Sequence, residues 1–210
     1  PTTSSAASDV YKRQDIDPSS INKNVKVDLA IVGDVKSVIT STLKTLKKSK
    51  PNFIRSNKQK TSKWWEKIQK WRSKRSLDYI GSEETIKPQY AIERLYELTK
   101  DKDTFITTEV GQHQMWAAQH YKFNKPNRWM TSGGLGTMGY GLPAAVGVQI
   151  AHPDKLVIDI AGEASVLMTI QEMSTAVQYN LPIKIFILNN QYMGMVRQWQ
   201  ELLHEKNYSE

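Results

Sequence analysis

Two polar positions in this sequence follow apolar runs of strand length and suit a divalent metal ion. Glu163 follows the run Leu156–Ile160, separated from it by Ala161 and Gly162, and Asn190 closes the Asn pair after Ile183–Leu188. A carboxylate and an amide offer the oxygen ligands that Mg²⁺ prefers, and phosphate oxygens commonly complete its shell. The small residues after Glu163 leave room for a diphosphate against backbone N–H groups. Taken alone, the same pattern also fits a surface glutamate and a turn-forming asparagine pair.

The elements that would position these side chains alternate between helix and strand from Gln89 onward. The spacing predicts a strand over Thr104–Thr108 between two helices, Ala91–Leu98 and one opening near Leu142, and a further helix over Glu172–Gln178. Such βαβ order implies an α/β fold with a parallel sheet covered by helices on both faces. Ligands in these folds collect beyond the carboxyl ends of the strands.

An earlier part of the chain, residues 15–50, is expected to be the end of another α/β domain. Asp15–Asp17 is typical of a strand end, and Leu29–Asp34 of a short buried strand closed by Gly-Asp. Apolar residues then recur at roughly helical spacing over Val35–Lys48, which predicts a helix.

Residues 51–90 are expected to form a basic connector with an amphipathic helix. Trp64, Ile68 and Trp71 fall on one helical face, and lysines occupy the other. Interleaved Trp and Lys could also stack on single-stranded nucleic acid. We favour a helix that packs its Trp face onto its own protein, because the Trp residues share the apolar face.

The net charge of +8 is concentrated in one segment. Residues 41–80 contain 13 Lys and Arg against Glu66 and Asp78, a local net charge of +11, so the other residues sum to −3. A nucleic-acid partner is therefore not expected for the fold as a whole. The absence of cysteine excludes disulfides and thiol nucleophiles. No apolar run approaches the ~18 residues of a membrane helix, so no membrane partner is expected.

The first residues are expected to lie outside the fold. Residues 9–14 match the in-frame translation of a transposase sequencing adapter, and residues 1–7 form a low-complexity Ser/Thr/Ala stretch. We therefore treat residues 1–14 as an adapter-derived or disordered tail. A genuine flexible N-terminus is the alternative.

Longer motifs connect these features. Glu109–Trp116, Thr131–Ala145 and Asn190–Trp199, together with the short segments Asp15–Pro18 and Gly33–Val35, resemble the acetohydroxyacid synthase (acetolactate synthase) family of thiamine-diphosphate enzymes. The resemblance covers residues 15–210 and implies that residues 91–210 are a truncated diphosphate-binding domain. It also implies that residues 15–50 end a Rossmann-like central domain that contacts FAD.

The resemblance assigns a role to each matching position. It implies that Gly136 offers its carbonyl to the aminopyrimidine, and that Met138 lies under the thiazolium and keeps the cofactor bent, which brings base and proton together. Mg²⁺ would be held by Glu163, Asn190 and the carbonyl of Tyr192. The implied thiamine-diphosphate contacts are Gln112, His113, Gly136, Thr137, Met138, Glu163, Ala164, Ser165, Asn190, Gln191, Tyr192, Met193, Gly194 and Met195. The implied FAD contacts are Asp15, Ile16, Asp34, Val35, Gln114, Met115, Gly133 and Gly134, and the implied substrate pocket is Met195, Val196 and Trp199.

The activity implied by the resemblance is the condensation of pyruvate with a second 2-keto acid, pyruvate or 2-ketobutyrate, with loss of CO₂, in branched-chain amino-acid biosynthesis. It implies a cytoplasmic or organellar homo-oligomer, dimer or tetramer, with a small regulatory subunit. Another family member, such as a catabolic acetolactate synthase or glyoxylate carboligase, is the closest rival. A noncatalytic nucleic-acid-binding module is a rival of another class.

Two residues depart from the family pattern, and part of the family's machinery is missing. Glu163 and Glu109 both stand where the family has Asp. The extra methylene at Glu163 is expected to weaken metal and cofactor binding, unless the codon carries a sequence error. The family's catalytic glutamate and its substrate-binding basic groups lie upstream of the matched region, so we expect this chain alone to be inactive.

Overall fold

The structure is a computed structural model that describes residues 10–75 and 77–209, with the side chains of residues 53–60 outside the description. The chain divides into two compact units, Pro1–Ser76 and Leu77–Glu210. We call them the first unit and the second unit. In the part of the chain that is described, no helix combines the length and apolarity that a membrane crossing requires.

The first unit is built on two parallel strands. Strand β1 (Lys12–Asp15) pairs with β2 (Leu29–Val32), and a short 3-10 helix, η1 (Pro18–Ser20), follows β1. Helix α1 (Val35–Ser49) begins at Asp34, whose carboxylate accepts a hydrogen bond from the Ser37 N–H at 3.0 Å. Side-chain acceptance of this kind satisfies one of the free N–H groups of a helix start. Helix α2 (Phe53–Arg72) completes the unit.

Three features of this unit differ from the sequence predictions. Residues 12–14 were assigned to the tail but form most of β1, because strand pairing uses backbone groups and depends little on side-chain identity. The strand predicted within Leu29–Asp34 is present as β2, but the prediction that it is buried was wrong, since all four residues of β2 are exposed. Residues 1–9 of the predicted tail lie outside the described residues.

The third difference is the exposure of the Trp face of α2. Trp64 and Trp71 are 53% and 47% exposed, so the expected burial of this face onto the protein is not found. The two rings pack against each other edge to face at 5.5 Å, and the Lys67 ammonium lies 5.4 Å and 5.2 Å from their centroids. Cation–π contacts of this kind stabilise rings that remain half in solvent.

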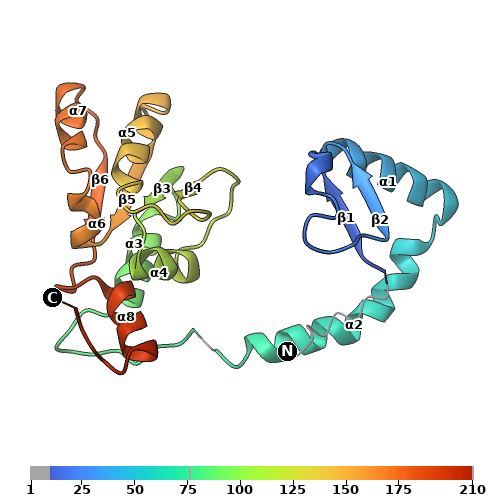
Figure 1. Cartoon of the computed structure of the whole chain (residues 1–210), viewed down its shortest axis with the longest axis horizontal. Coiled ribbons are helices and arrows are strands. Elements are labelled where there is room, and N and C mark those ends of the chain that lie inside the picture. Colours follow the sequence, from blue (N-terminus) through green and yellow to red (C-terminus); the bar gives the residue numbers. More distant parts are fainter. Residues whose placement is uncertain (1–9, 76, 210) are drawn as a thin grey trace. The chain divides into compact units, whose positions relative to one another are not determined.

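The second unit is a four-stranded parallel sheet in the order β4-β3-β5-β6, with helices on both faces (Figure 1). Its elements are α3 (Pro88–Thr99), β3 (Thr104–Thr108), α4 (Gln112–His120), β4 (Trp129–Thr131), α5 (Gly141–Ala151), β5 (Leu156–Ala161), α6 (Glu163–Leu167), α7 (Glu172–Gln178), β6 (Lys184–Ile187) and α8 (Gly194–Leu203). The prediction of an α/β fold with a parallel sheet is confirmed.

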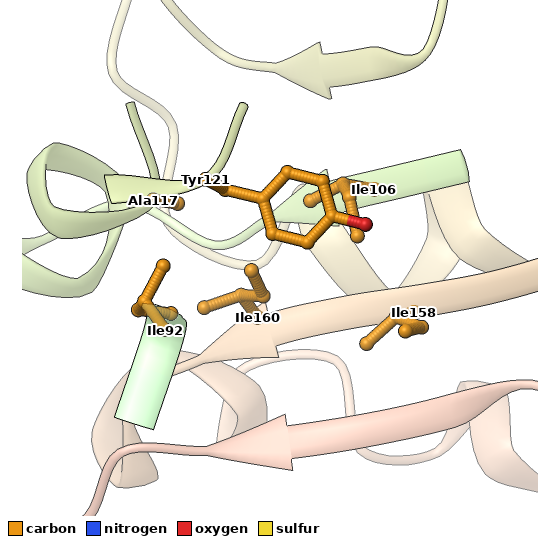
Figure 2. Packing of buried hydrophobic residues seen from close by; sticks show 6 residues of the cluster. All are labelled: Ile92, Ile106, Ala117, Tyr121, Ile158 and Ile160. Atoms are coloured by element: carbon orange, nitrogen blue, oxygen red, sulfur yellow. The ribbon is translucent and has the colours of Figure 1, made fainter. Parts of the chain in front are cut away.

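The two faces of the central strands have separate cores. On one face, α3 and α4 pack against β3 and β5, as Figure 2 shows for the cluster Ile92, Ile106, Ala117, Tyr121, Ile158 and Ile160. On the other face, α5 covers Phe105 and Val157 through Ala145. Successive strand residues point to opposite faces, which is why Ile158 and Val157 belong to different cores. β3 is buried along its whole length, as a central strand covered twice must be.

Helix α5 begins unusually close to the sheet. A Cβ added to Gly141, its first residue, would lie 2.3 Å from Asp159 Oδ1, 2.7 Å from Glu109 N and 2.8 Å from the Thr108 carbonyl carbon. Only glycine fits at this position without displacing the backbone of β3. This contact places the start of α5 directly over the carboxyl ends of β3 and β5.

Candidate cofactor site

A pocket lies where the central strands end. Its lining comes from the segments that follow β3 (residues 110–113), β5 (162–165) and β6 (190 and 192–196), together with Trp116, Met138 and Leu188. Because the strands are parallel, these segments emerge at the same edge of the sheet. The pocket is therefore a direct product of the topology.

Most residues predicted for thiamine diphosphate line this pocket. They are Gln112, His113, Met138, Glu163, Ala164, Ser165, Asn190, Tyr192, Met193, Gly194 and Met195, and Val196 from the predicted substrate set joins them. Among the described residues, Gly136, Thr137, Gln191 and Trp199 do not contribute to the lining. Trp199 is 56% exposed on α8, where the neighbouring Gln198 faces Gln112 instead.

His113 is held between two glycines. An added Cβ would lie 2.7 Å from its ring at Gly111 and 2.9 Å at Gly162, so both glycines are needed for the ring to fit. The ring is buried, and its Nε2 has no hydrogen-bond partner. A buried polar atom left without a partner costs about 1–3 kcal/mol. A ligand oxygen in the pocket would remove that penalty, which is the observation that fits a diphosphate here.

We expect His113 to remain neutral at pH 7. Burial lowers the pKa of His113 to about 4, and a hydrogen bond with the Glu109 backbone acts in the opposite direction. Because the pKa is lower in the folded state than its ordinary value of 6.5, the free energy of unfolding should decrease as the pH falls from about 6.5 to 4. NMR of ¹⁵N-histidine-labelled chain, with His113→Gln to assign the signal, measures this. Titration of His113 near pH 6.5 would contradict the structure.

The three residues predicted to bind Mg²⁺ all line the pocket. Glu163 opens α6, and the Asn190 side-chain oxygen accepts a 3.5 Å hydrogen bond from the Tyr192 N–H. In the part of the chain that is described, no group of three or more His, Cys, Asp or Glu side chains could hold a metal. One carboxylate, one amide and one carbonyl oxygen form a hard donor set that fits Mg²⁺ better than zinc.

Two of the predicted contact residues already have partners within the protein. Gln112 donates a hydrogen bond to Gln198 Oε1 at 3.0 Å, which ties the start of α4 to α8. The Ser165 hydroxyl accepts from the Gly162 N–H at 3.2 Å and donates to the Gly162 carbonyl at 3.1 Å. Ser165 is 1% exposed, so we expect it to shape the turn after β5. Gly162 was not predicted as a site residue, although its place before Glu163 could have indicated it.

The residues predicted for FAD fall in both units. In the first unit, Asp15 ends β1 opposite Val32, and Asp34 and Val35 follow β2, so they share the carboxyl edge of two parallel strands. Nucleotides commonly bind at that edge, and this part of the predicted set fits the group. In the second unit, Gln114 donates to the Thr131 hydroxyl at 2.7 Å, and Met115 is 42% exposed. Side chains added at Gly133 and Gly134 would meet no atom within 4 Å.

A buried acidic pair beside the pocket was not predicted from the sequence. Glu109 and Asp159 are both 0% exposed, and Asp159 Oδ1 accepts a 3.0 Å hydrogen bond from the Thr107 hydroxyl. Asp159 Oδ2 has no partner. Burial and then the Glu109 charge raise the pKa of Asp159 to about 7. Two carboxylates in one buried site repel each other, which adds to the effect of burial.

Comparison with known proteins decides the family of this fold and pocket. Residues 109–210 match the family model "Thiamine pyrophosphate enzyme, C-terminal TPP binding domain". This part of the chain belongs to the thiamine pyrophosphate enzyme family. Thiamine pyrophosphate is another name for thiamine diphosphate, so the match supports this cofactor. The pocket residues after β3, β5 and β6 all lie within the matched thiamine pyrophosphate enzyme domain.

The relatives of the chain extend beyond that domain. It is 47% identical to the acetolactate synthase isozyme 3 large subunit of Escherichia coli K12, over 93% of this chain and 33% of the relative. It is 50% identical to the acetolactate synthase large subunit of Buchnera aphidicola (Schizaphis graminum), with the same coverage. The chain is 48% identical to the mitochondrial acetolactate synthase catalytic subunit of Aspergillus candidus, over 93% of this chain and 28% of the relative. The resemblance stated from the sequence is confirmed, and the chain spans about a third of the length of these relatives.

Proposed function

We propose that this chain supplies the cofactor-binding part of an acetolactate synthase, which condenses pyruvate with a second 2-keto acid and releases CO₂. The observation that carries the proposal is the pocket that brings His113, Glu163, Asn190 and Met138 together. Identity of 45–50% to acetolactate synthase large subunits supports the choice within the family. Thiamine diphosphate, when bound, supplies an electron sink for the loss of CO₂ and the transfer of the remaining two-carbon unit.

The residues of the chain have distinct roles in this proposal. Glu163, Asn190 and the Tyr192 carbonyl hold Mg²⁺, which binds the diphosphate. His113 offers its otherwise unpartnered Nε2 to a diphosphate oxygen, whose negative charge favours a proton on that nitrogen. The Met138 side chain supplies an apolar surface beside the thiazolium ring and favours one bound conformation. Trp199 and Met195 select the acceptor 2-keto acid.

The proposal extends to the groups and partners that the resemblance implied. FAD binds residues 15–16, 34–35, 114–115 and 133–134 as a structural group, and the working enzyme is a homo-oligomer with a small regulatory subunit in the cytoplasm or an organelle. Reconstitution with FAD measures flavin binding. Mass photometry with and without the regulatory subunit measures the oligomeric state. Loss of flavin binding on Asp34→Ala is the expected result.

A chimera tests the activity. Residues 15–210 replace the matching third of the Escherichia coli isozyme 3 large subunit, to which the chain is 47% identical. We expect acetolactate from pyruvate that depends on thiamine diphosphate and Mg²⁺, and its loss in a matched Asn190→Ala chimera. A chimera that converts glyoxylate but not pyruvate would support a glyoxylate carboligase instead. One that binds thiamine diphosphate and turns over neither substrate would contradict the proposal.

Restoring aspartate at position 163 is expected to strengthen metal binding. The extra methylene of Glu163 moves its carboxylate outward, and Mg²⁺ tolerates little displacement of its ligands. We expect Glu163→Asp to lower the Mg²⁺ dissociation constant, measured with thiamine diphosphate present, by roughly tenfold, about 1.4 kcal/mol. Glu163→Gln, the control, keeps the side-chain length and removes the charge, and should raise the Mg²⁺ dissociation constant. Equal dissociation constants for the unsubstituted chain and the Glu163→Asp variant would refute this account of the site.

A further inference from the structure

Glu109 is a buried carboxylate to which the proposed function assigns no role. It follows β3 directly, and its N–H continues the strand pairing by donating to the Ile160 carbonyl at 3.0 Å. Both of its carboxylate oxygens accept backbone hydrogen bonds, from Gly139 N at 2.7 Å and from Leu142 N at 3.0 Å. Leu142 is the second residue of α5, so its N–H has no partner within the helix. Bonds from amides to a carboxylate are short and roughly twice as strong as neutral ones.

The Gly139 peptide is held from a second direction. The Thr169 hydroxyl donates to the Gly139 carbonyl at 3.2 Å, while Glu109 accepts from its N–H. Gly139 has φ +85°, and an added Cβ would lie 3.0 Å from Thr169 Cγ2. This residue therefore has one permitted position, set by side chains that are 30 positions away in each direction.

The segment before Gly139 has few such restraints. Side chains added at Gly133 and Gly134 would meet nothing within 4 Å, and Leu135 is 95% exposed. The Thr137 N–H bonds only to the nearby Ser132 hydroxyl. Met138, next to Gly139, is the residue of this segment that lines the pocket. Its position thus depends on the hydrogen bonds at Gly139.

We propose that Glu109 is a positioning residue for thiamine diphosphate, because its carboxylate holds Gly139 and thereby keeps the Met138 side chain in the cofactor pocket. The inference rests on the proposed function, since Met138 contributes only if the pocket holds this cofactor. Glu109 should therefore matter for the ring end of the cofactor. The diphosphate end is bound by His113, Glu163 and Asn190, whereas the hydrogen bonds given for the Glu109 carboxylate go to Gly139 and Leu142.

Two ligands allow binding at the ring end of the pocket to be measured separately from binding at the diphosphate end. Thiamine diphosphate reaches both ends of the pocket, whereas inorganic pyrophosphate reaches only the diphosphate end. In the full chain, Glu109→Gln keeps the side-chain length but turns an NH₂ group toward one of the two backbone N–H donors. We expect isothermal titration calorimetry with Mg²⁺ to show a roughly tenfold loss of thiamine-diphosphate affinity and an unchanged pyrophosphate affinity. Amide hydrogen exchange at Gly139 should accelerate in parallel, and Glu172→Gln on α7 is the matched control.

The outcomes distinguish this inference from the proposed function. Equal weakening of both ligands would assign Glu109 a general structural role and overturn the inference, as would no change in either. Failure of the unsubstituted chain to bind thiamine diphosphate would overturn the proposed function as well. In a Met138→Ala chain, Glu109→Gln should have no further effect on thiamine-diphosphate affinity, because the two residues act in series. Additive losses would contradict positioning through Met138.

Thr169→Val tests the same restraint without touching the acidic pair. It removes the hydroxyl bonded to the Gly139 carbonyl and keeps the side-chain shape, and Thr169 does not line the pocket. We expect a several-fold loss of thiamine-diphosphate affinity with pyrophosphate affinity retained. This variant keeps the inference testable if Glu109→Gln does not fold, and an unchanged affinity for thiamine diphosphate would overturn it.

Discussion

Replacing Gly141 by alanine is expected to lower the free energy of unfolding of the second unit by about 3 kcal/mol. The added methyl group would lie 2.3 Å from Asp159 Oδ1 and 2.7 Å from the backbone N of Glu109. Two of its three nearest atoms are strand backbone, which cannot rotate away as the end of a flexible side chain could. Helix α5 must therefore move outward, and it takes Leu142 and the Gly139 turn with it.

Gly147 offers a matched control in the same helix. A Cβ added there would meet nothing within 4 Å, and the residue is exposed. Gly147→Ala should raise the free energy of unfolding by about 1 kcal/mol, the difference in helix propensity. Urea unfolding followed by circular dichroism compares the two variants. A Gly141→Ala chain as stable as the unsubstituted one would show that α5 does not rest on β3 as described.

Replacing Asp159 by Asn is expected to remove the decrease in the free energy of unfolding that Asp159 causes between pH 4 and 7, and to leave the opposite pH dependence of His113. The pKa of Asp159 is about 7 in the folded state against 3.8 ordinarily. Between these values the folded chain keeps a proton that the unfolded chain has lost, so stability falls as the pH rises. Below about pH 4 the penalty vanishes, and above about pH 7 it is complete, at roughly 4 kcal/mol. Asp159→Asn should therefore be the more stable chain at pH 8.

The groups around Asp159 define how to measure this. The Thr107 hydroxyl donates to Oδ1, Glu109 is the charged neighbour, and Gly141 covers the site from α5. Urea unfolding at intervals from pH 4 to 8 gives the change in the free energy of unfolding with pH for the unsubstituted chain and for Asp159→Asn. Asp103→Asn is a useful comparison. Arg128 and Lys125 lower the pKa of Asp103, whereas the pKa of Asp159 is raised. An unchanged slope in Asp159→Asn would show that Asp159 ionises freely in the folded chain.

Elements with a strong local pattern were predicted correctly. Glu172–Gln178 and Thr104–Thr108 coincide with α7 and β3, and the helix expected over Ala91–Leu98 is the centre of α3. Helix α4 was not predicted, because its buried face consists of His113, Ala117 and His120, which give no apolar periodicity. Strand β4 has only three residues, too few to show a pattern. Helix α8 could have been predicted, since its apolar residues recur at helical spacing over Met195–Leu203.

The sequence by itself determined which groups could bind a metal and a diphosphate, and in which order along the chain they follow the strands. A Glu after one strand and an Asn after the next are local facts, and parallel pairing brings such positions to one edge whatever the details. The buried partners around them depended on tertiary structure. Thr107 meets Asp159 across 52 positions because the register of β3 and β5 places them opposite each other. Glu109 reaches Gly139 and Leu142 because Gly141 lets α5 approach the sheet closely. Register and close approach arise from packing between distant segments, so no local pattern in the sequence encodes them.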